Sequence, residues 1–463
     1  MVLGLEISTS SIKCILVDAE IGIIKQDVTA IKPEIANIVS MDPEKLYNHL
    51  IEFIKGFIGG YEDVIEEIAI VTLWNSLLFL SHKDKNQPIG RVKTWADTSG
   101  NLASLETQLD ESAYTGCPKH YKFTRWKLIK EEHRISVREG HCVGSLADYL
   151  YFRFTGKWVM SHMMASGSGL LNLSQKDWHL SALKLLGLDV AQLPALVNWQ
   201  YKARIKSDFA RTIGLSESVS VQVPNGDGGM NQYAESGLNI GVWSLSIGTS
   251  GALRCLSQNH NVPKGLWCHT FGEGYYIKGA TISGAGNCVQ WFLEKHNLDQ
   301  DFLNEVEASL SNMVIGQQPY YLPFIYGEQS PGWVSQRNSG YSETSRECTT
   351  VDLYYSLIEG ITFNLYQGYS LLKDEEGIPE TILISGGVVR TQYWLQLIAD
   401  VLGQPLVVST MEHSSLIGGI MSCGDYSIKN EKTLIEIKPD INKHQLLMTR
   451  FQGYKDFYTN IVT

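Results

Sequence analysis

Apolar residues along the chain follow two periods, and segments of the two kinds alternate. Spacings of three and four residues, typical of helices with one buried face, predict helices at 146–154, 352–371 and 393–402. Short β-rich runs predict a strand at 380–384 and, after the end of a helix, another within 64–79. Helices that alternate with strands in this way predict an α/β fold built in layers.

One pattern occurs twice, near the start of the chain and near its middle. Segment 4–16 reads G-L-E-I-S-T-S-S-I-K-C-I-L, and segment 244–256 reads S-L-S-I-G-T-S-G-A-L-R-C-L. Each has two β-rich runs around a turn of small and hydroxyl residues, so each is predicted to be a hairpin. Two such hairpins at the heads of two similar halves indicate a duplicated domain.

A break between the halves is predicted just before the second hairpin. Segment 221–229, V-Q-V-P-N-G-D-G-G, holds one proline and three glycines, residues that interrupt helices and strands. We place the boundary shortly after it, with one domain at 1–235 and the other at 236–463. A chain of 463 residues agrees with two domains, because single hydrophobic cores stop growing below that length.

The composition narrows the class of protein. With 44% hydrophobic and 19% charged residues, the chain has the make-up of an ordinary folded protein. A net charge of −11 argues against nucleic acid as a partner and against binding to an anionic membrane. The eight cysteines are scattered without a C-x-x-C pair, so reduced thiols are expected. Neither a signal peptide nor an apolar run of membrane-spanning length is visible, and we expect a cytoplasmic protein.

Several nucleotide and metal motifs are absent from the sequence. It has no G-x-x-x-x-G-K-[ST], no G-x-G-x-x-G at a strand–helix junction and no H-E-x-x-H. What remains are the turns 8–11 (S-T-S-S) and 248–251 (G-T-S-G), whose small residues let several backbone N–H groups point at one anion. Either turn alone is better explained as an ordinary hairpin turn. Their repetition favours two phosphate sites that hold one triphosphate between them.

Asp227 is the candidate for acid–base chemistry. It lies in G-D-G-G, where the flanking glycines allow a close approach of the backbone to other groups. Phosphoryl transfer to an alcohol needs a carboxylate within hydrogen-bond reach of the attacking hydroxyl. An aspartate that closes a turn in a loop explains the same pattern equally well, and spacing alone leaves both interpretations open.

These motifs, taken in order, resemble those of one family, the FGGY carbohydrate kinases, from residue 4 to about residue 424. On the phosphate and nucleotide side the resemblance rests on 6–13 (E-I-S-T-S-S-I-K), 246–250 (S-I-G-T-S), 286–291 (G-N-C-V-Q-W), 359–364 (E-G-I-T-F-N), 385–387 (S-G-G) and 414–419 (S-S-L-I-G-G). On the sugar side it rests on 71–77 (V-T-L-W-N-S-L), 94–98 (T-W-A-D-T), 116–120 (G-C-P-K-H) and 148–156 (D-Y-L, then R-F-T-G).

The resemblance implies two actin-like (ribonuclease H-like) α/β domains with a cleft between them. It also implies ATP-dependent phosphorylation of a terminal hydroxyl of a small open-chain sugar, with Asp227 as the catalytic base. The implied ATP-binding residues are Thr9, Ser10, Ser11, Lys13, Gly248, Thr249, Ser250, Gly286, Gln290, Gly386, Gly387 and Thr391. The implied sugar-binding residues are Trp74, Asn75, Trp95, Asp97, Lys122 and Asp227. Glu6 would orient Mg²⁺ through water, and a homodimer is expected from base rates.

The sequence departs from the family pattern at several positions. Glu6 replaces an aspartate, and Ser8 replaces a glycine, which would be strained if that position required positive φ. Ser99 replaces an arginine, which favours a neutral ketose such as L-fuculose or D-xylulose over gluconate. Lys122 fits either a contact with an anionic sugar or an ordinary solvated position on the surface, so gluconate kinase stays an alternative. A catalytically weakened regulatory protein on the same scaffold is the alternative of another class, and a sugar-independent actin-like ATPase is a third.

Overall fold

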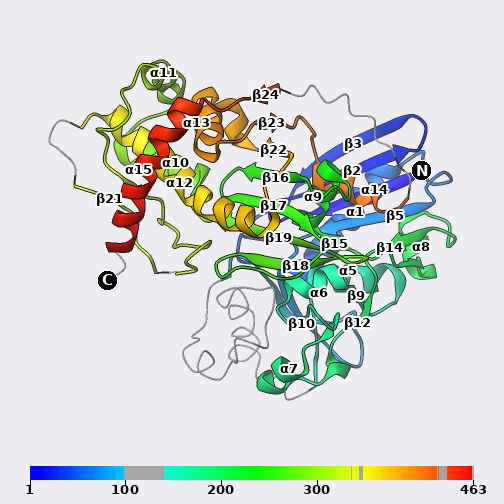
Figure 1. Ribbon diagram of the computed structural model, residues 1–463. Helices are drawn as coiled ribbons and strands as arrows, with labels where there is room; N and C mark the ends of the chain where they lie inside the picture. Colours follow the sequence, from blue (N-terminus) through cyan, green and yellow to red (C-terminus); the bar gives the residue numbers. More distant parts are fainter. Residues whose placement is uncertain (98–139, 335, 344–347, 425, 427–434, 461–463) are drawn as a thin grey trace.

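The computed structural model describes residues 1–97, 140–334, 336–343, 348–424, 426 and 435–460. Two seven-stranded sheets dominate this part of the chain (Figure 1). The first runs β13-β14-β5-β1-β2-β3 with β15 beside β5, and the second runs β18-β19-β17-β16-β22-β23-β24. Every strand of the first sheet lies before residue 227 and every strand of the second lies after residue 241. The boundary near residue 235 stays a prediction.

The strands of the first sheet are β1 (Val2–Ile7), β2 (Ser11–Asp18), β3 (Gly22–Ala30), β5 (Glu67–Thr72), β13 (Lys202–Arg204), β14 (Ser220–Gln222) and β15 (Asn225–Gly226). Those of the second are β16 (Val242–Ile247), β17 (Gly251–Ser257), β18 (Trp267–Gly272), β19 (Tyr275–Ile282), β22 (Thr381–Ser385), β23 (Leu406–Val408) and β24 (Ile435–Ile437). A four-stranded sheet holds β4 (Ser40–Met41), β7 (Pro88–Thr94), β6 (Ser76–Leu80) and β8 (Cys142–Gly144). Two-stranded ladders join β9 (Val159–Ser161) to β12 (Ala195–Val197), β10 (Leu171–Asn172) to β11 (Asp177–Trp178), and β20 (Tyr321–Leu322) to β21 (Gly340–Tyr341).

The helices that accompany the first sheet are α1 (Pro43–Ile58), α5 (Leu146–Thr155), α6 (His162–Gly167), α7 (Leu180–Leu186), α8 (Ser207–Ile213) and α9 (Asp227–Ser236). Those of the second half are α10 (Gly286–His296), α11 (Gln300–Ser311), α12 (Thr350–Glu376), α13 (Gln392–Leu402), α14 (Ser414–Met421) and α15 (Ile441–Asn460). Their ends carry the expected signals: Asp42 caps α1 ahead of a proline, and Thr349 and Asp352 form a capping box on α12.

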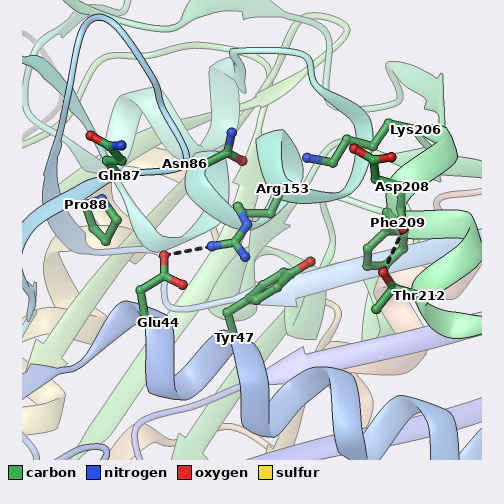
Figure 2. Close-up of a pocket in the computed structure, with 10 residues that line it drawn as sticks. All are labelled: Glu44, Tyr47, Asn86, Gln87, Pro88, Arg153, Lys206, Asp208, Phe209 and Thr212. Carbon is green, nitrogen blue, oxygen red and sulfur yellow. Dashed lines mark hydrogen bonds and ion pairs between the residues drawn. The ribbon is translucent and has the colours of Figure 1, made fainter.

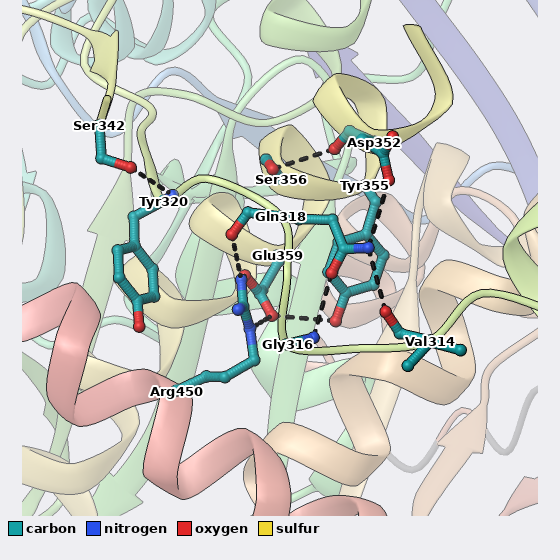
Figure 3. A network of polar contacts seen from close by, with 10 residues as sticks. All are labelled: Val314, Gly316, Gln318, Tyr320, Ser342, Asp352, Tyr355, Ser356, Glu359 and Arg450. Atoms are coloured by element: carbon teal, nitrogen blue, oxygen red, sulfur yellow. Dashed lines mark hydrogen bonds and ion pairs between the residues drawn. The ribbon is translucent and has the colours of Figure 1, made fainter. Parts of the chain in front are cut away.

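Helix α12 is the centre of the second half. Its middle is buried, and a Cβ added at Gly360 would lie 2.1 Å from the carbonyl oxygen of Tyr321, so only glycine allows this close approach. Arg450 on α15 donates to both oxygens of the Glu359 carboxylate on α12, at 2.7 and 2.6 Å (Figure 3). This buried, bidentate ion pair fixes the last helix to the core.

Helix α14 comes late in the chain but packs on the first sheet. In Figure 1 this orange helix lies beside the blue strands β1 and β5, and it also contacts α9. A Cβ added at Gly418 would lie 2.0 Å from the carbonyl oxygen of Met230 on α9, and one added at Gly4 on β1 would lie 2.7 Å from Ile420. Glycine at both positions therefore lets the two halves meet at close range.

A second contact between the halves is apolar. One buried cluster combines Trp74 and Met230 from the first half with Leu256, Trp267 and Phe271 from the second. The strand β18, which carries two of these residues, packs on α6. The two sheets are thus joined around one region, at which β5, β15 and α9 also meet.

Both predicted hairpins are confirmed, as β1–β2 and β16–β17. The helices predicted at 146–154, 352–371 and 393–402 are present as α5, α12 and α13, with α12 longer at both ends. Of the helix end and the strand predicted within 64–79, the strand is confirmed as β5, whereas the helix end is wrong. Helix α1 already ends at Ile58. The segment instead holds two strands, β5 in the first sheet and β6 in the four-stranded sheet.

None of the seven cysteines in the described part of the chain forms a disulfide, and all of them except Cys348 are buried. Within the same residues, no helix is long and apolar enough to cross a membrane.

Candidate active site

Three chain segments leave the first sheet side by side. β1, β5 and β15 are parallel, and the register pairs Ile7 with Thr72 and Thr72 with Gly226. The Thr72 hydroxyl also donates to the carbonyl of Ile7 at 2.9 Å. The next residues of the three strands therefore emerge together, and they begin the Ser8 turn, the turn that carries Trp74, and the helix that starts at Asp227. Ligands of α/β sheets bind at such carboxyl ends of strands.

Asp227 is the first residue of helix α9, with Gly226 as its cap. Its carboxylate accepts a hydrogen bond of 2.8 Å from the backbone N–H of Gly228. Burial, first of all, raises the pKa of Asp227, and the charge of Glu6 raises it further. The Gly228 N–H, the Arg254 charge and the backbone of Trp74 oppose this rise without cancelling it. Asp227 is thus a carboxyl group of raised pKa at the start of a helix, and not a turn residue in a loop.

Trp74 packs against the start of helix α9, which carries Asp227. Its ring is 7% exposed, and its indole N–H donates to the carbonyl of Met163 at 2.8 Å. A Cβ added at Gly226 would lie 2.5 Å from the ring, and one at Gly228 would lie 3.4 Å from it. The glycines that flank Asp227 therefore pack directly on this tryptophan. Trp74, predicted to bind sugar, forms the floor of the site, and little of its ring is open to a ligand.

The turn at 8–11, predicted to bind phosphate, is closed by Ser8. Its hydroxyl donates to the carbonyl of Ser11 at 3.0 Å and accepts from the backbone N–H of Ser11 at 3.1 Å. Five non-glycine residues in the described chain have positive φ, and Ser8 is not among them. Serine thus fits this position without the strain that positive φ would impose. Thr9 and Ser10 form the outer tip of the turn, and Ser10 is exposed.

Glu6 and Lys13 lie opposite each other across the β1–β2 hairpin. The Lys13 ammonium donates to Oε2 of Glu6 at 3.0 Å, and the Ser415 hydroxyl donates to Oε1 at 2.9 Å. Glu6 is 6% exposed, so its charge is held in the interior by these two partners. Each carboxylate oxygen keeps a further lone pair, because an ionised carboxylate has about four acceptor sites.

The second turn predicted to bind phosphate, at 248–251, is held by the start of helix α10. Gly286 and Asn287 donate their backbone N–H groups to the carbonyls of Gly248 and Thr249, at 2.9 and 3.1 Å. A Cβ added at Gly286 would lie 2.6 Å from the Gly248 oxygen, so this contact requires glycine. Gly248, Thr249 and Ser250 are all exposed. The turn is therefore held from behind while its tip stays open.

A third turn lies beside the second. β22 runs parallel to β16, with Ser385 paired to Ser246, and the chain then turns at Gly386, whose φ is +96°. A Cβ added at Gly386 would lie 2.3 Å from the Ile247 oxygen. Gly386 and Gly387 are exposed at this edge, and the Thr391 hydroxyl donates to the carbonyl of Val388. The turns predicted to bind nucleotide are thus neighbours at one edge of the second sheet.

The remaining predicted residues lie in other segments of the chain. Gln290 is exposed on α10, where its amide donates to Glu294 at 2.8 Å. Trp95 is 48% exposed, whereas Asp97 is 5% exposed and forms an ion pair of 3.1 Å with Lys93. Asn75 is half-buried beside Gly167. Lys122, Ser99 and the loop 116–120 lie outside the described residues.

Arg254 is a residue of the site that the sequence analysis missed. It lies on β17, donates to the Ser246 hydroxyl at 3.0 Å, and has its Nε 3.3 Å from a Cβ added at Gly228. Burial lowers the pKa of its guanidinium, and the charge of Asp227 opposes that shift. The available signal was a single arginine inside the apolar run A-L-R-C-L of the second hairpin.

A hollow of about 710 Å³ elsewhere in the first half contains none of the predicted site residues (Figure 2). In it, the Arg153 guanidinium lies 3.6 Å from the centre of the Tyr47 ring and donates to Glu44 at 2.8 Å. Lys206 also lines the hollow, and its pKa is lowered by burial and by the nearby Arg153. Glu44 and Asp208 offset these two cations, so the hollow has no excess of either charge.

Comparison with known proteins points to one family. The model of the FGGY family of carbohydrate kinases, N-terminal domain, matches residues 1–232, and that of the C-terminal domain matches residues 243–424. A gluconokinase of Bacillus subtilis is 22% identical and aligns over 100% of this chain and 99% of its own. A xylulose kinase of Staphylococcus epidermidis is 23% identical over 99% of this chain and 96% of its own.

Solved structures agree in fold. A xylulose kinase from Lactobacillus acidophilus superposes with a TM-score of 0.87 at 19% identity, covering 100% of this chain and 98% of its own. A gluconate kinase from the same organism gives 0.87 at 20% identity, covering 99% and 98%. A glycerol kinase of Plasmodium falciparum, solved with ADP, gives 0.83 at 17% identity, covering 98% and 97%. The predicted two-domain α/β fold class is confirmed.

Proposed function

Because the chain belongs to the FGGY family of carbohydrate kinases, we propose that it transfers the terminal phosphoryl group of ATP to a terminal hydroxyl of a small open-chain sugar, with Asp227 as the general base. The observation that carries this proposal is the register of β1, β5 and β15. That register places Asp227 next to the first phosphate turn, at the edge of the sheet where ligands of α/β proteins bind.

The chemistry follows from the surroundings of Asp227. A hydroxyl that attacks phosphorus must lose its proton, and a carboxylate within hydrogen-bond reach can accept it. The raised pKa of Asp227 makes it a stronger base than an ordinary aspartate. The Gly228 N–H, at 2.8 Å, holds one oxygen of this carboxylate in place, and the backbone of Trp74 also stabilises its charge. A positioned base of this kind contributes about 10²–10⁴ to the rate.

We assign ATP to the exposed turns. In this proposal the first turn and Lys13, together with Gly248, Thr249 and Ser250, bind the phosphates through backbone N–H groups, hydroxyls and one ammonium. We assign the nucleoside part of ATP to the edge formed by Gly286, Gly386 and Gly387. The tight contacts that require glycine at 286 and 386 support the assignment, because they keep three backbone turns together without side chains between them.

The site also fits a magnesium ion. Mg²⁺ is usually bound by one or two carboxylates, by substrate phosphates and by water. Glu6 directly precedes the first turn, and Lys13 and Ser415 each use only one acceptor site on its two oxygens, so its carboxylate can still bind the ion through water. No group of three or more protein ligands occurs among the described residues, which agrees with an ion that arrives with the nucleotide. When bound, Mg²⁺ would neutralise charge on the phosphates.

The choice of sugar stays open between two classes. We propose a neutral ketose such as D-xylulose or L-fuculose, on the basis of Ser99, with gluconate as the alternative. Relatives named xylulose kinase and gluconokinase match this chain about equally well. The sequence departures at Ser8 and Glu6 do not favour a weakened regulatory protein. Ser8 has no positive φ, and the Glu6 carboxylate accepts hydrogen bonds from Lys13 and Ser415. A cytoplasmic homodimer remains our expectation.

A coupled ADP-release screen tests the proposal. The purified chain would be assayed with ATP and Mg²⁺ against ketopentoses, 6-deoxyketoses, aldonates and glycerol. We expect turnover that depends on one of these sugars and that disappears when Mg²⁺ is chelated. ADP release at the same rate with and without every sugar would contradict the proposal and favour a sugar-independent ATPase.

A further inference from the structure

Arg254 uses few of its hydrogen-bond donors in contacts with the described protein residues. Within the described residues its guanidinium donates one hydrogen bond, to the Ser246 hydroxyl at 3.0 Å, out of the five N–H donors that arginine carries. It faces the first turn of α9, where its Nε lies 3.3 Å from a Cβ added at Gly228. A cleft residue with so many unused donors can hold a ligand rich in acceptor oxygens.

The electrostatic surroundings of Arg254 are unfavourable without such a ligand. The N-terminal end of a helix carries partial positive charge, so a cation at the start of α9 is repelled. Burial also lowers the pKa of this guanidinium, and Asp227 opposes the shift. Asp227 thus compensates part of the cost of this buried charge, and an anionic ligand would compensate more of it.

The position of Arg254 identifies the anion. Its hydrogen-bond partner Ser246 lies two residues before the second turn, and its Nε lies beside Gly228, the residue after Asp227. The group that moves from the nucleotide to the sugar must pass between that turn and that base. We propose that Arg254 is a further catalytic residue, which contacts the phosphoryl group during its transfer; this inference rests on the proposed function.

The step balances without any further reactant. The oxygen of the sugar hydroxyl forms a bond to the γ-phosphorus, and the bond from that phosphorus to the β–γ bridging oxygen breaks. ADP leaves with the electron pair of the broken bond, and Asp227 takes the hydroxyl proton. Arg254 neither gains nor loses a proton. Its planar guanidinium can donate two parallel hydrogen bonds to the phosphoryl oxygens. These bonds stabilise the negative charge that the oxygens carry in the transition state.

A carboxylate of the sugar is the other anion that arginine could bind here. The two cases differ in which substrates depend on Arg254. A residue that contacts the phosphoryl group acts on every sugar, whereas a residue that recognises a carboxylate acts only on acidic sugars. The ligand-binding properties of the two cases differ as well, because only the first involves the nucleotide.

The test uses Arg254→Gln, Arg254→Lys and the control Arg204→Gln, which removes an exposed arginine on β13. We expect Arg254→Gln to lower kcat about 10³-fold on every accepted sugar, as for other arginines that contact a transferring phosphoryl group, with KM for the sugar unchanged. Arg254→Lys should recover part of the loss, and the control should match the unmodified protein. Unchanged kcat, or a loss confined to aldonates, would overturn the proposal.

A second measurement does not depend on knowing the sugar. ADP with aluminium fluoride mimics the phosphoryl group in transfer, and its binding can be measured by calorimetry without any sugar. Arg254→Gln should weaken binding of this mimic at least about tenfold, one factor of ten being about 1.4 kcal/mol, and leave binding of ADP alone unchanged. Equal binding of the mimic to both proteins would overturn the inference. Failure of the proposed function would instead show as no sugar-dependent turnover in the unmodified protein.

Discussion

The Ser415 hydroxyl donates a hydrogen bond of 2.9 Å to Oε1 of Glu6, although the two residues are 409 positions apart in the sequence. The other carboxylate oxygen accepts from Lys13 at 3.0 Å. Helix α14 of the second half therefore completes the surroundings of the acidic residue that precedes the first phosphate turn. Because Glu6 also raises the pKa of Asp227, this contact connects the arrangement of the two halves to the strength of the base.

Removing the Ser415 hydroxyl tests that connection. Ser415→Ala leaves one buried carboxylate oxygen without its partner, which should lower the free energy of unfolding by about 1–3 kcal/mol. Urea unfolding followed by fluorescence measures this change. Ser414→Ala is the matched control on the same helix, since its hydroxyl accepts from Asn231 and not from a buried carboxylate. Equal stability of Ser415→Ala and the unmodified protein would contradict this description of Glu6.

The pH dependence of kcat/KM reports on Asp227. The base works when it has lost its proton, so the rate should fall on acidification around a pKa above the ordinary 3.8. Glu6→Gln removes the charge that raises this pKa and should move the acid limb to lower pH. Arg254→Gln removes a charge that lowers it and should move the limb to higher pH. Shifts of the same sign in both variants would contradict this electrostatic account.

The same pKa shift predicts an effect on stability. The folded protein binds the Asp227 proton more tightly than the unfolded chain does, so this residue lowers stability as the pH rises from 3.8 through its folded pKa. Asp227→Asn removes that effect and should be more stable than the unmodified protein at pH 7. Thermal unfolding at pH 7 and at acidic pH checks the prediction. The gain should shrink at acidic pH, where both proteins are neutral at this position.

Gly286→Ala tests the support of the second phosphate turn. The added Cβ would lie 2.6 Å from a backbone oxygen of that turn, so either the turn or α10 must move. We expect KM for ATP to rise at least about tenfold, a loss of about 1.4 kcal/mol in binding. Gly56→Ala is the control, because its Cβ would meet nothing within 4 Å on α1 and should stabilise the helix. An unchanged KM in Gly286→Ala would contradict a role of this turn in binding ATP.

Some features could be predicted from the sequence because they depend on neighbouring residues. The two hairpins and the turns at their tips are set by β-rich runs around small residues, and both are present at the expected positions. The end of α13 followed from Gly403, which adopts the left-handed conformation just past the helix. The glycines beside Asp227 are also a local signal in the sequence. They allow the start of helix α9 to pack closely on Trp74.

Other features depend on contacts between distant segments, and the sequence does not show these. Arg254 becomes a site residue only because β17 faces the start of α9. Glu6 is held by Ser415 only because α14 packs on the first sheet. Trp74 was expected to bind sugar, but Gly226 and Gly228 pack on it and leave little of its side chain exposed. In each case the partner lies in another part of the chain.

The ion pair between Arg450 and Glu359 should be structural. Both residues are almost fully buried, and the Tyr355 hydroxyl also donates to Glu359, at 2.9 Å (Figure 3). Arg450→Met leaves this carboxylate without its countercharge and should lower the free energy of unfolding by about 3–5 kcal/mol. Adding Glu359→Gln should recover part of the loss. Equilibrium unfolding of both variants checks this, and a double variant less stable than the single one would contradict it.

The most direct test of the proposed function is the kinetics of Asp227→Asn beside calorimetry of ATP binding. Asparagine keeps the size of the side chain but cannot accept the hydroxyl proton, so kcat should fall by about 10²–10⁴ while ATP affinity is unchanged. Asp301→Asn is the control, because Asp301 also lies in the first turn of a helix but is exposed. Sugar-dependent turnover by Asp227→Asn at the rate of the unmodified protein would contradict the assignment of Asp227 as the base.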